Sequence, residues 1–110
     1  MNVLVVDDDV TITRLLGAAL TVEEGVDDIR VVHRGSDALD VCVAFHPDVI
    51  ILDYWMPGMD GAEAAGRIRE VCPDARIVAF SGVLEGKPEW ADAYYPKGDL
   101  PDIETIIRLP

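Results

Sequence analysis

Basic residues are scarce in this chain. Lysine and arginine together make up 9 of its 110 residues, against 21 aspartates and glutamates, and the formal net charge is −12. Nucleic acids and anionic membrane surfaces attract proteins through clustered positive charge. The composition therefore excludes direct binding of this chain to nucleic acid or to an anionic membrane surface.

Long hydrophobic runs are also lacking. No stretch approaches the roughly 20 apolar residues that a membrane-spanning helix needs. The first predicted strand begins at Asn2, with no basic region and apolar signal segment before it. We therefore expect a cytoplasmic protein that does not enter a membrane.

Cysteine is rare as well. Cys42 and Cys72 are the only two, they lie in separate predicted helices, and neither belongs to a CxxC pair, so we expect two reduced thiols that fill space. His33 and His46 lack a third ligand at metal-binding spacing and are expected to be ordinary residues. A chain of 110 residues is too short for two independent cores, so residues 1–110 are predicted to form a single domain.

Apolar runs of strand length alternate with segments of helical pattern along the chain. Such alternation is typical of an α/β fold in which parallel strands are joined by right-handed crossovers. We expect one sheet that is covered by helices on both faces. Its predicted strands are residues 2–7, 28–33, 48–53, 76–80 and 93–95.

The segments between these strands carry helical patterns with one apolar face. Asp9 is expected to cap the first helix and Ser36 the second, which ends before Pro47. The third helix is predicted over residues 62–71, and a last short helix begins near Asp99. The residues predicted to face the core are Ile12, Leu15, Leu16, Ala19 and Leu20 in the first helix, Leu39, Cys42 and Phe45 in the second, Ala65, Ile68 and Cys72 in the third, and Ile103, Ile106 and Ile107 in the last.

Polar or charged side chains follow four of the five predicted strands. Because helices follow these strands, their carboxyl ends meet at one edge of the sheet, where α/β proteins bind ligands. Carboxylates about 4 Å apart repel by roughly 4 kcal/mol at an effective dielectric near 20, so a cluster of them requires a cation, and oxygen ligands favour Mg²⁺. The side chains are Asp7 and Asp8 after the first strand, Asp53 after the third, Ser81 after the fourth and Lys97 after the fifth.

This set of groups suits the transfer of a phosphoryl group to a carboxylate. Asp53 would be the nucleophile, Mg²⁺ would neutralise the incoming oxygens, and Ser81 and Lys97 would bind them. The most specific sequence is DYWMPGMDG at residues 53–61, together with VAFSG at residues 78–82 and the pair Pro96-Lys97.

With the N-terminal acids, these stretches resemble the receiver domain of two-component response regulators, over essentially the whole chain. The resemblance implies a flavodoxin-like, doubly wound five-stranded parallel sheet of order 2-1-3-4-5. It also implies a switch controlled by phosphorylation, which catalyses only its own phosphorylation and dephosphorylation. The implied partners are a sensor histidine kinase or phosphotransfer protein, and a downstream output protein or an output domain of a longer regulator.

The resemblance assigns roles at the phosphoryl group residue by residue. Asp53 matches the phosphoacceptor, Lys97 the lysine of the family and Ser81 its switch hydroxyl. Tyr94 matches the aromatic residue that turns inward on phosphorylation. Tyr94 and Tyr95 alternate along a strand, so one of them must face the core whatever the function.

The resemblance also assigns the Mg²⁺ ligands and the surroundings of the acceptor. The metal is expected on Asp8, on Asp53 and on the backbone carbonyl of Trp55, with Asp7 bound through water. In the family, the side chains two residues after the acceptor and two after the switch hydroxyl flank the approach of water. Here they are Trp55 and Val83.

Two departures from the family pattern affect the end of the chain. Gly98 follows Lys97 where a proline is usual, and Pro96 precedes it, so the loop that aims the lysine is expected to differ. The distance from Ser81 to Lys97 is also several residues shorter than usual. We therefore expect a shortened or irregular fourth helix, with a turn or two of helix at residues 89–92.

Two alternatives remain open at this point. Asp7-Asp8-Asp9-Val10-Thr11 also fits the strand-end motif of haloacid dehalogenase-type Mg²⁺ phosphatases, with Asp7 as nucleophile and Asp9 as acid/base. The short chain, the lack of a fourth acidic motif and the unexplained Asp53 loop oppose that alternative, and Asp9 is better interpreted as a helix cap. The other alternative is a degenerate receiver that serves only as a protein-binding module, which the complete set of acids disfavours.

Overall fold

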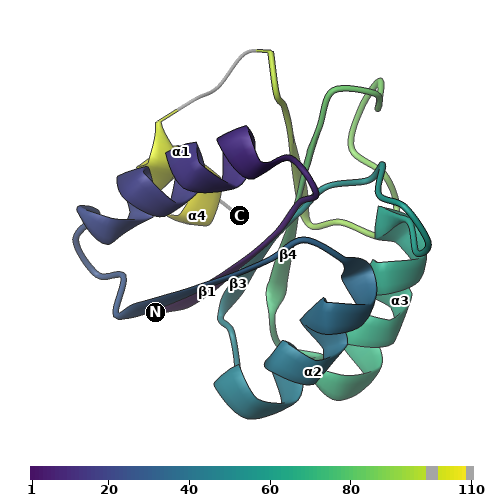
Figure 1. The fold of residues 1–110 in the computed structure, drawn as a ribbon, viewed down its shortest axis with the longest axis horizontal. Helices are drawn as coiled ribbons and strands as arrows, with labels where there is room; N and C mark the ends of the chain where they lie inside the picture. Colours follow the sequence, from purple (N-terminus) through teal and green to yellow (C-terminus); the bar gives the residue numbers. More distant parts are fainter. Residues whose placement is uncertain (99–101, 109–110) are drawn as a thin grey trace.

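Five parallel strands run through the middle of the molecule, with helices against both faces of the sheet (Figure 1). The computed structural model describes residues 1–98 and 102–108. The strand order is β2-β1-β3-β4-β5, which confirms the doubly wound α/β fold. Every predicted strand end lies within one residue of the observed bounds, which are β1 Asn2–Val6, β2 Asp28–Val32, β3 Val49–Leu52, β4 Arg76–Ser81 and β5 Ala93–Pro96.

The helices pack on the sheet in two layers. α1 and α4 cover one face, and α2 and α3 cover the other. Successive residues of a strand point to opposite faces, so Leu4 and Val6 of β1 lie under α2 and α3, whereas Val3 and Val5 lie under α1 and α4. Burial on both faces explains why residues 3–6 of β1 and all of β3 are unbroken apolar runs. The helices are α1 Val10–Thr21, α2 Gly35–Phe45, α3 Gly61–Val71 and α4 Ile103–Arg108.

The first helix is capped as expected, but the rest of the protein buries a narrower face of it than the sequence pattern predicts. The Asp9 side chain accepts hydrogen bonds from two N–H groups of the first turn of α1. Leu16 and Leu20 are buried, as predicted, but Leu15 is 60% exposed, so its assignment to the core was wrong. Leu15 lies about 100° around the helix from Leu16, beyond the side that the sheet and the short α4 cover.

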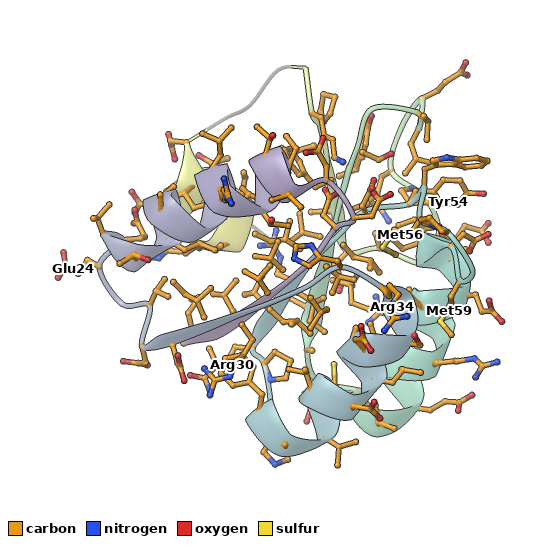
Figure 2. All side chains as sticks on the ribbon, viewed as in Figure 1. Glu24, Arg30, Arg34, Tyr54, Met56 and Met59 are labelled. Carbon is orange, nitrogen blue, oxygen red and sulfur yellow. The ribbon has the colours of Figure 1, made fainter. Side chains whose placement is uncertain are left out.

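The prediction that Ser36 caps the second helix was also wrong. The N-cap position lies two residues earlier, at Arg34, which makes no side-chain hydrogen bond to the helix, and α2 begins at Gly35. Arg34 and Met59 lie side by side at this helix start (Figure 2). A Cβ on Gly35 would lie 3.2 Å from the Sδ of Met59 and 3.3 Å from the Cβ of Ala64. The glycine therefore lets the first turn of α2 approach α3 closely, which a local capping pattern does not reveal.

Cys42 and Cys72 are free and buried, as expected, and the fold places them next to each other. The Sγ of Cys72 donates a hydrogen bond to the backbone carbonyl of Cys42 at 3.3 Å. Burial, and then the neighbouring Cys72, raise the pKa of Cys42 to about 12. The Cys42 thiol therefore stays protonated at neutral pH, which suits a space-filling residue.

The segment between β4 and β5, residues 82–92, is described throughout and contains no helix. The expected irregularity is therefore present, but the helix predicted over its last four residues was wrong. What forms there is one turn, in which the N–H of Ala91 donates to the carbonyl of Pro88 at 3.3 Å. The Oδ2 of Asp92 accepts a hydrogen bond from the N–H of Ile77 at 2.8 Å, which ties the end of the segment to β4.

The last helix is short. α4 spans six residues, and Ile106 and Ile107 are buried in the core beside α1, as predicted. The start predicted near Asp99 lies outside the described residues. Within the part of the chain that the structure describes, no helix is long and apolar enough to cross a bilayer.

Candidate functional site

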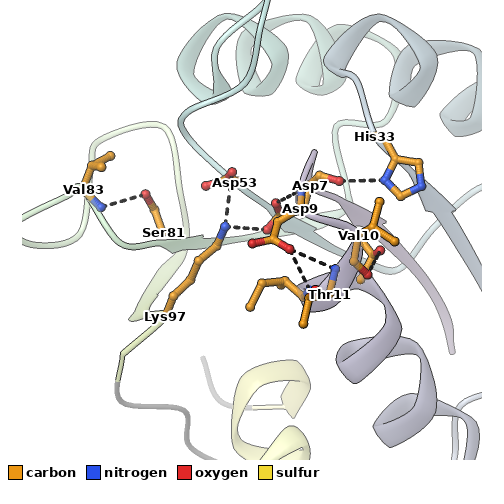
Figure 3. Close-up of polar contacts among 11 residues, drawn as sticks. Asp7, Asp9, Val10, Thr11, His33, Asp53, Ser81, Val83 and Lys97 are labelled. Atoms are coloured by element: carbon orange, nitrogen blue, oxygen red, sulfur yellow. Dashed lines mark hydrogen bonds and ion pairs between the residues drawn. The ribbon is translucent and has the colours of Figure 1, made fainter.

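Polar and charged side chains meet at the carboxyl edge of the sheet (Figure 3). Asp7 directly follows β1, Asp53 follows β3, Ser81 ends β4 and Lys97 follows β5. These four strands are consecutive neighbours in the sheet. The sheet order therefore brings together residues that lie up to 90 positions apart in the sequence.

Three carboxylates form the centre of this edge. One oxygen each from Asp7, Asp8 and Asp53 lies within 4.8 Å of the others. Asp7 and Asp53 are 2% and 4% exposed, whereas Asp8 is exposed. This donor set consists of oxygens alone and has one ligand open to solvent, so it fits a hard divalent cation such as Mg²⁺.

The third acid of the N-terminal run is engaged elsewhere. The Oδ1 of Asp9 accepts hydrogen bonds from the N–H groups of Thr11 at 2.9 Å and Ile12 at 3.2 Å. The backbone N–H of Asp9 donates to the Oδ1 of Asp7 at 2.9 Å. Asp9 thus caps α1 with its carboxylate and supports Asp7 with its backbone.

Lys97 reaches the carboxylates although glycine follows it and proline precedes it. Its Nζ lies 2.7 Å from the Oδ2 of Asp7 and 3.3 Å from the Oδ2 of Asp53. Burial alone would lower the pKa of Lys97, but hydrogen bonds and charge from Asp7 and then Asp53 outweigh it and raise the pKa above its usual value. Lys97 is therefore a permanent positive charge at this site.

One lysine does not neutralise the cluster. Burial, and next the negative charge of Asp7, raise the pKa of Asp53 from 3.8 to about 6, although Lys97 acts in the opposite direction. An ionised Asp53 is therefore held in an environment that disfavours its charge. A bound cation would relieve that penalty.

The loop that follows Asp53 is folded tightly onto the start of α3. A Cβ on Gly61 would lie 2.6 Å from the backbone oxygen of Asp53, and the N–H of Gly61 donates to the carbonyl of Tyr54 at 2.8 Å. Only glycine permits this approach, which holds the backbone of Asp53 in place. Met56 is buried under the loop, whereas the side chain of Trp55 is 71% exposed.

Ser81 and Tyr94 both contact the segment at residues 82–92. The Oγ of Ser81, which is almost fully buried, accepts a hydrogen bond from the N–H of Val83 at 3.2 Å. The hydroxyl of Tyr94 donates to the carbonyl of Leu84 at 2.7 Å. Tyr95 packs on the opposite face of the sheet, in the core beside α1 and α4.

Sequence reasoning missed a contact of His33. Its Nδ1 lies 3.0 Å from the backbone carbonyl oxygen of Asp7 (Figure 3). The two residues are 26 positions apart, so no spacing rule could have linked them. The available signal was that His33 is the last residue of a predicted strand whose carboxyl end belongs to the same edge.

Comparison with known proteins agrees with this fold. The family profile described as "Response regulator receiver domain" matches residues 3–94. A protein-glutamate methylesterase/protein-glutamine glutaminase of Rhodopseudomonas palustris is 43% identical over 105 residues, which cover 96% of this chain and 28% of that protein.

Solved structures of response regulators have the same fold as this chain. The response regulator TrrA of Thermotoga maritima in complex with Mg²⁺-BeF has a TM-score of 0.77 and 36% identity, covering 87% of this chain and 85% of that one. A structure of histidine kinase ThkA in complex with TrrA matches with a TM-score of 0.75, covering 87% and 84%. The chain spans about 30% of the length of the curated relatives that it matches.

Proposed function

This chain belongs to the response regulator receiver domain family, which serves two-component signalling, and from that premise we propose that Asp53 accepts a phosphoryl group in a Mg²⁺-dependent reaction. The donor would be a sensor histidine kinase or a phosphotransfer protein. The phosphorylated chain would then act as a switch, with no other substrate of its own.

The observation that carries this proposal is the set of charged groups around the Asp53 carboxylate. Its carboxylate is buried beside those of Asp7 and Asp8, and the amine of Lys97 lies 3.3 Å from its Oδ2. A nucleophilic carboxylate, a cation site and a fixed positive charge are the groups that phosphoryl transfer to an aspartate requires.

The oxygens that remain free suggest how the cation would be held. Each carboxylate oxygen of Asp7 already has a partner, one the N–H of Asp9 and one Lys97, which favours the water-mediated role that the family resemblance assigns to Asp7. Asp8 and Asp53 would bind it directly, with the backbone carbonyl of Trp55 as a further ligand. When bound, Mg²⁺ would neutralise charge on the phosphoryl oxygens as they approach the carboxylates.

The chain's own residues would perform the transfer around Asp53. An oxygen of the Asp53 carboxylate forms a bond to phosphorus while the bond from phosphorus to the donor nitrogen breaks, and that nitrogen keeps the electron pair. Lys97 would pair with a phosphoryl oxygen. The Ser81 oxygen accepts from the N–H of Val83, so its own hydrogen is free to donate to another phosphoryl oxygen.

The same contacts provide a path from the acceptor to the surface. Movement of Ser81 toward the phosphoryl group would pull on Val83 and Leu84, and Leu84 is the partner of the Tyr94 hydroxyl. The segment at residues 82–92 would therefore change position with phosphorylation. Its target would be a downstream protein or an output domain, as in the longer methylesterase relatives.

The two alternatives meet specific difficulties. A phosphatase that uses Asp7 as nucleophile needs Asp9 as acid/base, but the Oδ1 of Asp9 accepts two hydrogen bonds from the first turn of α1, which holds this carboxylate at the helix start. A binding module without phosphorylation would not need buried carboxylates in one cluster, since these raise the electrostatic cost of folding.

Labelling with acetyl phosphate and Mg²⁺ tests the proposal. We expect an acid-stable, hydroxylamine-labile phosphoryl group on the wild type and none on Asp53→Asn. A label that survives in Asp53→Asn and is lost in Asp7→Asn would favour the phosphatase. No label on the wild type from either acetyl phosphate or a kinase would favour the binding module.

A further inference from the structure

One side chain that takes no part in the proposed reaction holds the backbone of the acidic pair. His33 lies directly after β2, and its Nδ1 is 3.0 Å from the carbonyl oxygen of Asp7 (Figure 3). A carbonyl oxygen only accepts hydrogen bonds, so Nδ1 must carry the proton and donate it. The contact therefore ties the end of β2 to the peptide group that connects Asp7 with Asp8.

Asp7 is held at each of its polar atoms. Its N–H donates to the carbonyl of Val32 at 3.2 Å, its Oδ1 accepts from the N–H of Asp9 at 2.9 Å, and its Oδ2 lies 2.7 Å from the Nζ of Lys97. His33 supplies the remaining contact, to the carbonyl oxygen. It is a side chain outside the reacting groups, and among the described residues it joins Asp7 to the end of β2.

Asp8 lacks such support for its side chain. Among the described residues, no hydrogen bond or ion pair involves the Asp8 carboxylate, which is exposed. Its direction therefore depends on its backbone. The carbonyl of Asp7 and the N–H of Asp8 belong to one planar peptide group, so a donor that fixes this carbonyl also fixes the plane from which Asp8 departs.

We propose that His33 is a positioning residue for the cation site, which orients the Asp7–Asp8 peptide so that the Asp8 carboxylate faces Asp53. The inference rests on the Mg²⁺-dependent function proposed above. It requires that His33 affects the affinity for Mg²⁺ and leaves the chemical step unchanged. Hydrogen-bonding partners of metal ligands commonly act in this way.

Isothermal titration with Mg²⁺ alone tests the inference on two variants. His33→Leu removes the donor, and we expect it to weaken Mg²⁺ binding by about tenfold, the lower end of the usual effect of losing such a partner. His33→Asn places an amide N–H near the position of Nδ1, and we expect its affinity to stay within about twofold of the wild type. His46→Asn, a substitution at the C-cap of α2, is the matched control and should bind Mg²⁺ as the wild type does.

A second measurement separates positioning from general destabilisation. In phosphorylation by acetyl phosphate, His33→Leu should need more Mg²⁺ for half-maximal rate but reach the wild-type rate at saturation. Thermal unfolding without Mg²⁺ should show both variants fully folded at the temperature of the titration, with His33→Leu melting somewhat below His33→Asn because it leaves the Asp7 carbonyl without its donor.

Three outcomes decide against the inference. Unchanged Mg²⁺ affinity in His33→Leu would overturn it while the proposed function stands. Equal weakening in His33→Asn and His33→Leu would overturn it too, because the hydrogen-bond donor would then be irrelevant. A wild type that binds no Mg²⁺ would overturn the proposed function, and this inference with it.

Discussion

Tyr54 and Trp90 stack on each other, with ring centroids 6.2 Å apart and ring planes inclined by 18°. Tyr54 follows the proposed acceptor Asp53, and Trp90 lies in the segment at residues 82–92. Arg69 of α3 reinforces the contact, because its guanidinium donates to the carbonyl of Trp90 at 3.1 Å. The segment that replaces a helix is therefore fastened to the loop that carries the acceptor.

The first prediction is that Trp90→Ala loosens this segment. Loss of an aromatic pair removes about 1 kcal/mol, so cleavage by a glutamyl endopeptidase after Glu85 and Glu89 should become roughly fivefold faster. Mass spectrometry of timed digests measures the two sites. Trp90→Phe keeps an aromatic ring and should be cleaved at close to the wild-type rate. Equal cleavage of Trp90→Ala and the wild type would show that other contacts hold the segment.

The second prediction concerns stability and pH. The folded protein raises the pKa of Asp53 from 3.8 to about 6, so the stability associated with protonated Asp53 is fully present below pH 4 and is lost as the pH rises through 6. At about 1.36 kcal/mol per tenfold change in proton affinity, the ionised form is disfavoured by roughly 3 kcal/mol at most. Asp53→Asn, which stays neutral, should thus be more stable than the wild type at pH 7 without Mg²⁺.

Thermal denaturation in a chelator from pH 4 to pH 8 measures this effect. The advantage of Asp53→Asn should disappear near pH 4, and Mg²⁺ should reduce it at pH 7 by stabilising the wild type. Asp37→Asn removes a partly exposed carboxylate that pairs with Arg34 and should show no such gain. An advantage of Asp53→Asn that does not change with pH would contradict the electrostatic cause.

The third prediction separates two neighbouring acids. Asp8→Asn should weaken Mg²⁺ binding strongly, because it removes a charged ligand that is open to the cation. Asp9→Ala should leave Mg²⁺ affinity nearly unchanged but cost about 1 kcal/mol of stability, because it removes the cap of α1. Calorimetric titration and urea unfolding measure the two effects. Equal loss of Mg²⁺ affinity in both variants would mean that the roles of the two acids are misassigned.

The fourth prediction concerns the lifetime of the phosphoryl group. The side chains that the family resemblance places beside the acceptor, Trp55 and Val83, are 71% and 60% exposed, and neither can orient a water by accepting a hydrogen bond. Hydrolysis of the phosphorylated Asp53 should therefore be slow, and Trp55→Asn should speed it by several-fold to about tenfold, which corresponds to roughly 1.4 kcal/mol. Decay of labelled protein after donor removal, in Mg²⁺, measures it. Trp55→Phe is the control, and a half-life unchanged in Trp55→Asn would show that the indole does not limit access of water.

The errors in the sequence predictions arise from tertiary packing, which a local pattern does not display. Leu15 fits an apolar helical stripe, yet the neighbouring elements are too short to cover it. Ser36 is a good capping residue, yet the packing of Gly35 against α3 moves the helix start before it. The weak helical pattern at residues 89–92 is overridden by the bond from Ile77 to Asp92. At Ser36 and at residues 89–92 a contact with a distant element outweighs a local preference, whereas at Leu15 no element lies near enough to bury an apolar side chain.

What the sequence by itself determined is the strand positions, the parallel α/β architecture, and the set of acids, hydroxyl and lysine that the strand ends carry. Apolar periodicity and strand-end chemistry are local properties, so a single sequence displays them. Only the tertiary structure decided that Lys97 lies nearer to Asp7 than to Asp53, that His33 supports the acidic pair, and that Trp90 stacks on Tyr54. Those contacts join residues 26 to 90 positions apart, and they exist because the order of the strands, rather than the order of the residues, places them together.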